Sequence, residues 1–99
     1  IEPTKFTLYQ NYPNPFNPST AIEYEVPEIS GRVPRVAIQI FNMLGQKVLT
    51  IERGEKDAGR YRVVWDGLDQ TGARVPSGVY IYRLVSQDFA RSKKMVLVK

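Results

Sequence analysis

The two carboxylates best spaced for chemistry are Asp66 and Asp69, which stand in a turn-like run at residues 65–72. Together they could ligate calcium, which binds several oxygen atoms in proteins. Their spacing does not match the alternating acids of an EF-hand loop, and the run contains no further carboxylate. Aspartate followed by glycine is typical of turns in which the side chain accepts nearby backbone amides. We therefore expect turns here, and the sequence leaves open whether the pair binds a cation.

Other residue combinations that perform catalysis are incomplete. The chain has no cysteine and no histidine, so disulfides and zinc–thiolate sites are excluded and the commonest general base is missing. Ser19, Ser77 and Ser86 have no histidine to activate them. Glu23 and Glu25 stand two residues apart, which places both on the solvent face of a strand. The sequence therefore predicts a protein that is not an enzyme and that needs neither a cofactor nor a metal ion.

Size and composition indicate one small folded domain. The 99 residues are 42% hydrophobic and 24% charged, as in ordinary globular proteins, and no apolar run is long enough to span a membrane. The sequence begins at Ile1 without an initiator methionine or a signal pattern, so we expect a piece of a longer protein. We expect residues 1–99 to form a single domain, with residues 1–5 as a linker from an upstream cargo domain.

Positive charge is concentrated at the end of the chain. The formal net charge is +4, and the last stretch contains Arg91, Lys93, Lys94 and Lys99 without an acidic residue. A basic end favours nucleic acid, an anionic lipid or polysaccharide surface, or an acidic receptor groove. Because these residues alternate along strands and do not line one aromatic groove, we expect no nucleic-acid binding.

Apolar and polar residues alternate over most of the chain, as they do in half-buried β-strands. The expected strands are residues 6–9, 20–26, 35–41, 47–51, 60–65, 79–85 and 92–99. No window combines helical periodicity with capping residues. Short strands separated by turns every ~10 residues are typical of immunoglobulin-like sandwiches. The predicted fold class is therefore all-β, an immunoglobulin-like antiparallel β-sandwich of about seven strands.

The same alternation predicts the core. The residues expected to face inward are Ile22, Tyr24, Val26, Val36, Ile38, Ile40, Tyr61, Val63, Trp65, Tyr80, Tyr82, Leu84, Met95 and Leu97. Residues 42–45 predict a tight turn, because asparagine and glycine tolerate positive φ angles. The connection at residues 66–77 is longer than a hairpin requires, so we expect it to cross between the two sheets.

The segment from Tyr12 to Thr20 contains three prolines, which exclude it from a helix and from a central strand. It also contains Tyr12 and Phe16, two large rings that a free linker has no reason to expose. We expect a stiff lead-in to the strand that starts at Thr20, with both rings packed down. The alternative is that the rings are exposed for a partner.

The terminal run at residues 93–99 has two interpretations. Lysines on an edge strand prevent edge-to-edge aggregation. An accessible basic strand is also a suitable targeting signal, which a partner could recognise by strand addition and by its charge. The sequence leaves open whether this strand is free or paired.

Several motifs occur in a characteristic order along nearly the whole chain. They are residues 12–20 (YPNPFNPST), 40–48 (IFNMLGQKV), 58–59 (AG), 65–67 (WDG), 77–84 (SGVYIYRL) and 93–99 (KKMVLVK). Together they resemble the C-terminal type A sorting domain of the type IX secretion system. That family overlaps the immunoglobulin-like domain of the flagellar hook-capping protein, which is not an export signal.

The resemblance implies a non-catalytic module that directs a secreted cargo protein to the cell surface or exterior. It implies transit through the periplasm, recognition by an outer-membrane translocon, and removal by a sortase-like peptidase as the cargo is attached to surface lipopolysaccharide. The residues that it assigns to recognition are Pro13, Asn14, Pro15, Gly45, Gly78, Tyr80, Lys93, Lys94, Met95, Val96, Leu97, Val98 and Lys99.

Two other functions fit the same fold. A carbohydrate-binding module of a secreted hydrolase would present exposed, coplanar aromatic rings on its surface. A passive immunoglobulin-like spacer would need no exposed site.

Overall fold

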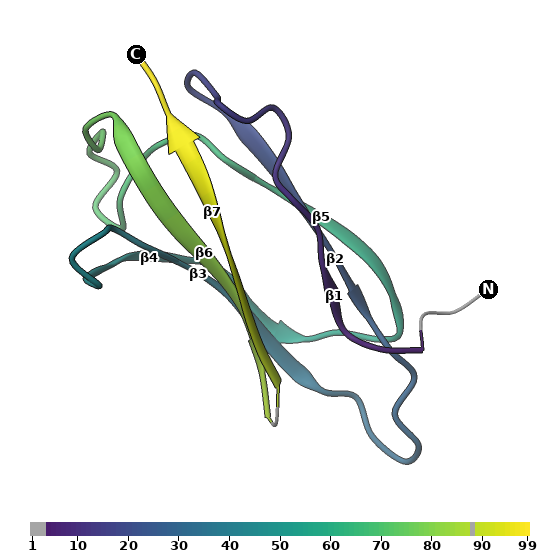
Figure 1. The fold of residues 1–99 in the computed structure, drawn as a ribbon. Helices are drawn as coiled ribbons and strands as arrows, with labels where there is room; N and C mark the ends of the chain where they lie inside the picture. The colour runs from purple at the N-terminus through teal and green to yellow at the C-terminus, as the bar shows by residue number, and fades with distance from the viewer. Residues whose placement is uncertain (1–3, 88) are drawn as a thin grey trace.

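The computed structural model describes residues 4–87 and 89–99. These residues form seven strands and no helix. Figure 1 shows how the strands are arranged. The strands are β1 (Thr7–Leu8), β2 (Thr20–Val26), β3 (Arg35–Phe41), β4 (Lys47–Glu55), β5 (Gly59–Trp65), β6 (Gly78–Ser86) and β7 (Phe89–Leu97). Within the described residues there is no long apolar helix that could cross a membrane. The predicted linker at residues 1–5 lies mostly outside them.

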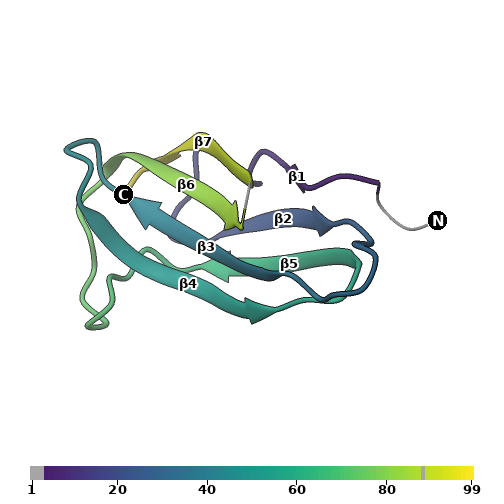
Figure 2. The ribbon, with the colours of Figure 1, turned by 90° about the horizontal axis from the view of Figure 1, so that it is seen from below.

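The strands form two antiparallel sheets. The three-stranded sheet has the order β1-β2-β5, and the four-stranded sheet has the order β4-β3-β6-β7. Figure 2 shows β4 and β7 at opposite edges of the four-stranded sheet. The predicted antiparallel sandwich of about seven strands is confirmed. The connection at residues 66–77 links β5 in one sheet to β6 in the other, so the predicted crossing is also correct.

Two strands have the predicted bounds, and β4 and β7 extend three or four residues beyond theirs. The alternating runs of β2 and β3 coincide with the strands observed. β4 continues four residues past Ile51, and β7 begins at Phe89, before the expected start at Ser92. These additional residues are mostly polar, and they pair with the backbones of β3 and β6. Ladder hydrogen bonds therefore lengthen strands where the hydrophobic pattern has ended.

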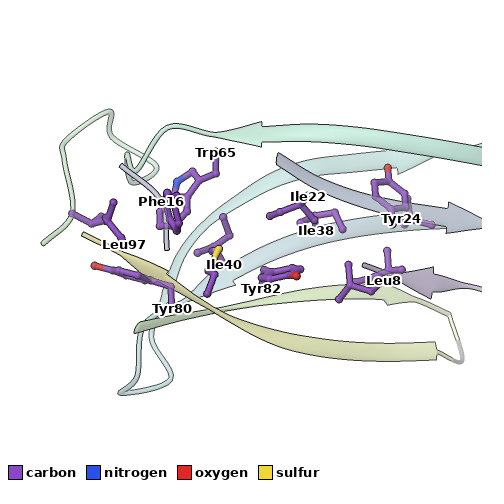
Figure 3. Packing of buried hydrophobic residues seen from close by; sticks show 14 of the residues in the cluster. Leu8, Phe16, Ile22, Tyr24, Ile38, Ile40, Trp65, Tyr80, Tyr82 and Leu97 are labelled. Atoms are coloured by element: carbon purple, nitrogen blue, oxygen red, sulfur yellow. The ribbon is translucent and has the colours of Figure 1, made fainter. Parts of the chain in front are cut away.

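The space between the sheets is filled by aromatic and aliphatic side chains, most of which Figure 3 shows. Of the residues expected to face inward, twelve are buried, whereas Tyr61 and Val63 pack against the core while partly exposed. β5 is the edge strand of its sheet, which explains their exposure. Trp65 is 1% exposed, and its indole nitrogen donates to the Leu68 carbonyl at 2.9 Å.

The tight turn predicted at residues 42–45 is present. Gly45 has φ of +83°, in the left-handed region that a side chain disfavours. The Asn42 side-chain oxygen accepts the amides of Leu44 and Gln46, both at 3.0 Å. These bonds hold the turn between β3 and β4 at the end of the sandwich where β7 also ends.

Candidate recognition site

The proline segment lies along the outer edge of β7 and is bonded to it. Phe16 forms a parallel bridge with Leu97, in which the Phe16 amide donates to the Val96 carbonyl at 2.9 Å. The Val98 amide in turn donates to the Phe16 carbonyl at 2.9 Å. In Figure 1 the segment lies beside the end of the terminal strand. The strand whose state the sequence left open is therefore paired on both sides here.

Two side chains extend this contact. The Asn14 side-chain oxygen accepts the Val96 amide at 3.0 Å. The Gln10 side-chain amide donates to the Lys94 carbonyl at 2.8 Å. The outward-facing backbone of β7 from Lys94 to Val98 is thus bonded by a segment about eighty residues away in the sequence.

Phe16 anchors the segment in the core. Its ring is 1% exposed, and the ring centroid lies 5.7 Å from that of Trp65. Figure 3 shows Phe16 beside Trp65. Beneath the crossing lies Gly67, with φ of +77°. A Cβ there would stand 3.4 Å from the Pro18 carbonyl oxygen and 3.7 Å from Leu97. The Trp-Asp-Gly turn therefore makes room for the segment to cross the end of the sandwich.

Tyr12 does not pack down, so that expectation is wrong for this ring. It is 80% exposed, whereas Phe16 is buried. Tyr12 pairs with Ala21, whose side chain points away from the core because its neighbours Thr20 and Ile22 are buried. Residues paired directly across a ladder share a face, so the Tyr12 ring lies on the outer face of the three-stranded sheet.

A buried polar network, which the sequence analysis does not predict, holds the start of the segment. The Asn11 amide donates to the Tyr82 hydroxyl at 2.8 Å, and that hydroxyl donates to the Tyr9 carbonyl at 2.7 Å. The Asn11 side chain also donates to the Thr20 hydroxyl at 2.9 Å, and Thr20 donates to the Pro13 carbonyl at 2.8 Å. Burial raises the pKa of Tyr82 to about 12, so this phenol is a neutral donor. The available signal was Thr20, a polar residue in phase with buried Ile22.

Gly78 and Tyr80 lie directly beside the terminal strand. In the β6–β7 ladder Gly78 pairs with Leu97 and Tyr80 pairs with Met95. Tyr80 is buried, with its ring edge-on to Trp65 at 5.3 Å and its hydroxyl donating to the Pro76 carbonyl at 2.6 Å. Contacts with the rest of the sandwich therefore cover most of the surface of the Tyr80 side chain.

The structure gathers the residues assigned to recognition at one end of the sandwich. Gly45 occupies the neighbouring turn, and the proline segment, Gly78, Tyr80 and the terminal strand are in contact. A partner can reach only some of them. The exposed members are Pro13, Asn14, Pro15, Gly45, Gly78, Lys94, Val98 and Lys99. Lys93 and Val96 are half-buried, while Tyr80, Met95 and Leu97 belong to the core.

The aspartates at residues 65–72 have structural partners. Asp69 Oδ1 accepts the Thr71 hydroxyl at 2.6 Å, the Thr71 amide at 2.9 Å and the Ala73 amide at 3.0 Å. The Thr71 hydroxyl first, and then the backbone amides, hold the pKa of this carboxyl below its usual value. The predicted turn is confirmed for Asp69. Asp66 instead accepts the Ser19 hydroxyl at 2.8 Å, which is a side chain rather than the expected backbone amide.

Little else at this end resembles a binding site for a metal. No group of three or more acidic side chains gathers within the described part of the chain.

A groove of about 500 Å³ lies between the β3–β4 turn and the loop at residues 66–77. Gln70 of this loop bonds the outer edge of β4, accepting the Thr50 amide and donating its own amide to Val48, both at 3.2 Å. Both edges of the four-stranded sheet are therefore covered at the same end.

Residues 19–88, more than half of the chain, match the FlgD Ig-like domain family. The dimeric latent PorU from Porphyromonas gingivalis has a similar structure, with a TM-score of 0.76 and 21% identity over 99% of this chain and 10% of that chain. PorZ, described as an essential bacterial surface component of the type-IX secretion system of the same organism, also has a similar structure. Its TM-score is 0.60, with 20% identity over 93% of this chain and 11% of that chain.

The chain spans about a tenth of each of these two proteins. A comparison with curated protein sequences gives no significant match. At identities near one fifth, the two structures show a shared fold. The family match and the seven-stranded sandwich agree, and the chain belongs to the FlgD Ig-like domain family.

Proposed function

We propose that this chain is a non-catalytic, C-terminal targeting domain, which directs an attached cargo protein through the type IX secretion system to the cell surface or exterior. The observation that carries the proposal is the hydrogen-bonded pairing of the proline segment with the terminal strand. These are the two ends of the motif order that resembles the sorting domains. Folding turns two separate sequence signals into one composite surface.

The comparisons support this proposal in a specific way. The family match covers residues 19–88 and so includes neither the proline segment up to Pro18 nor β7. The structural likeness to PorU extends over 99% of the chain and therefore includes most of both. PorZ is itself described as a component of the type-IX system. The elements beyond the family core are thus shared with PorU at the level of fold.

In the proposed mechanism the sandwich acts as a rigid holder. Phe16 and the Asn11 network fix the segment, so that Pro13, Asn14 and Pro15 stand exposed beside Lys94 and the residues that follow it. An outer-membrane translocon would read this surface in the periplasm. A sortase-like peptidase would then remove the domain as the cargo is attached to lipopolysaccharide.

The test is export of a reporter. Residues 1–99 are fused to a periplasm-directed fluorescent protein in a bacterium with a working type IX system, and surface and medium fractions are measured. We expect the reporter outside the cell, and we expect deletion of residues 93–99 to retain it in the periplasm. Unchanged delivery after this deletion would overturn the proposal.

Because that deletion also removes Met95 and Leu97 from the core, a milder variant is needed. Lys94→Glu with Lys99→Glu reverses two exposed charges and leaves the core intact. The matched control is Lys5→Glu with Arg53→Glu, two exposed residues away from this end that form no ion pair among the described residues. We expect export to fall for the first pair only. An equal effect of the two pairs would show that net charge, rather than the composite surface, governs export.

One observation favours a second function, a carbohydrate-binding accessory module. Exposed Tyr12 borders a pocket of about 150 Å³ together with Gln10, Glu23 and Arg62. A tyrosine face beside hydrogen-bonding side chains is suited to a sugar ring. Calorimetric titration against a glycan panel tests it: saturable binding that Tyr12→Ala abolishes would support this function, and a flat titration would exclude it for that panel.

A further inference from the structure

The outer edge of β7 is divided into two parts with different surroundings. From the Lys94 carbonyl to the Val98 amide, its outward backbone groups bond with Gln10 and the proline segment; we call this the covered half. Backbone groups alternate sides along a strand, so Ala90 and Ser92 face the same outward direction as Lys94 and Val96. The β6–β7 register is regular from Phe89 to Leu97, which preserves this alternation. We call residues 90–92 the open half.

The backbone of the open half has no described partner on its outer side. Across residues 4–87 and 89–99, no hydrogen bond reaches the outward amides and carbonyls of Ala90 and Ser92. Both residues are small and exposed. β1 approaches β7 here and Phe6 stacks on Phe89 at 4.9 Å, yet neither forms a hydrogen bond with Ala90 or Ser92. A row of unpaired strand groups of this kind is a template for an additional strand.

The described charged residues beside this edge are all basic. Arg91 and Lys93 flank Ser92, and Arg83 is its partner across the β6–β7 ladder. The ion pairs found among the described residues involve Lys56, Arg60 and Arg62, which lie outside β7, and none involves Arg91 or Lys93. Arg91 instead lies over the ring of Phe89, 5.7 Å from its centroid. The open half therefore carries positive charge that these carboxylates do not neutralise.

Positive charge on an exposed edge has two consequences. It repels a second copy of the same edge, which protects the domain from edge-to-edge aggregation. It also selects among strands, because an acidic strand is attracted where a basic one is repelled. An added strand would place alternate side chains beside Arg91 and Lys93 and the others over Ala90 and Ser92. Acidic residues suit the first positions, and small apolar residues suit the second.

We propose that the open half of β7 binds an acidic, extended segment of a partner protein by strand addition. Backbone hydrogen bonds to Ala90 and Ser92 would supply the pairing, and Arg91 and Lys93 would select acidic side chains. This surface is distinct from the exposed end at residues 13–15 and 94–99. Its test therefore stands or fails separately from the export test above.

The direct probe is a fluorescent peptide of alternating glutamate and valine, titrated against the domain and followed by anisotropy and amide chemical shifts. We expect saturable binding with shifts at Ala90, Ser92 and Lys94 and little change at Val98. Binding should weaken as salt rises, since the selecting charges are exposed. A peptide of alternating lysine and valine should not bind.

Two changes separate strand addition from charge attraction alone. N-methylation of the peptide on one backbone edge removes the donors that pairing requires, without altering its charge. Ser92→Pro removes one outward amide of β7, with Ser92→Ala as the matched control, because this amide does not bond β6. The N-methylation and the Ser92→Pro variant are each expected to weaken binding at least about tenfold. The charge reversal Arg91→Glu with Lys93→Glu should weaken it to a similar degree.

The overturning results are equally specific. Equal binding of the methylated and unmethylated peptides would show a purely electrostatic contact and would refute strand addition. Shifts confined to residues 13–15 and 94–99 would place the site elsewhere. Self-association of the domain through this edge, measured by sedimentation, would identify a second copy as the occupant and would also refute the proposal.

Discussion

The covered and open halves of the β7 edge belong to the same strand, yet they avoid uncontrolled pairing by different physical means. In the covered half, Asn14 and Phe16 occupy the backbone groups directly, and the Phe16 ring is buried beneath the contact. In the open half, the backbone is free within the described residues, and Arg91 and Lys93 flank it.

The difference has a functional meaning. A covered edge excludes every incoming strand, whatever its sequence, because its hydrogen bonds are already made. A charged edge excludes only strands of like charge and remains available to acidic ones. One strand can therefore present a fixed surface at its end and a selective surface in its middle.

The largest expected effect comes from removing the anchor of the covered half. Phe16→Ala should lower the free energy of unfolding by ~3–5 kcal/mol, since a fully buried ring is lost beside Trp65. Urea denaturation measures this change. The control is Tyr12→Ala, an exposed ring in the same segment, which should cost less than ~0.5 kcal/mol. Similar losses for both variants would contradict the assignment of Phe16 as the anchor.

The next effect concerns two buried tyrosines with different hydroxyl partners. Tyr82→Phe should cost ~1–3 kcal/mol, because it leaves the Asn11 amide and the Tyr9 carbonyl without a buried partner. Tyr24→Phe should cost less than Tyr82→Phe, because the buried Tyr24 hydroxyl has the Glu52 carboxylate near it but forms no well-aligned hydrogen bond among the described residues. Thermal and urea unfolding of the two variants measure this difference in stability. A larger loss for Tyr24→Phe than for Tyr82→Phe would refute the hydrogen-bond network.

A smaller effect is expected from Asn14→Ala, which removes one exposed hydrogen bond from the covered half. The loss should be ~0.5–1 kcal/mol, typical of a single solvent-accessible bond. Amide hydrogen exchange should quicken at Val96 and stay unchanged at Ser92. Faster exchange at both positions would indicate that the two halves open together, and so would erase the distinction between them.

The smallest effect concerns Asp69, whose loop covers the opposite edge of the sheet through Gln70. Its pKa lies below the usual 3.8, so the unfolded state binds more protons between the two values. Its stabilising contribution is therefore complete above the unfolded value and is lost as pH falls through the folded one. Asp69→Asn should lower stability at neutral pH and lose its effect in strong acid. A pH-independent difference in urea unfolding would contradict this.

The sequence predicted the sandwich well because most strands obey a simple alternation. β2 and β3 were located to the residue, since each buries one face and exposes the other. The polar extensions of β4 and β7 were missed, because pairing with a neighbouring backbone leaves no periodic signal. The turn at Gly45 followed from residue types that tolerate positive φ.

The site was harder to predict because its contacts join distant parts of the chain. Asn11 and Tyr82 are 71 residues apart, and Asn14 and Val96 are 82 apart. A segment with three prolines has no periodicity, so it could not reveal that Phe16 turns inward and Tyr12 outward. Register with β2 and β7 decides this, and register is a property of the folded sheet.

Native-state amide hydrogen exchange of residues 1–99, read residue by residue, tests the central claim most directly. We predict that the amides of Phe16, Val96 and Val98 are protected through their bonds between segment and strand, whereas those of Ala90 and Ser92 exchange as exposed groups do. Equal protection along the whole outer edge of β7, or none at Val96 and Val98, would contradict the division of this strand into a covered and an open half.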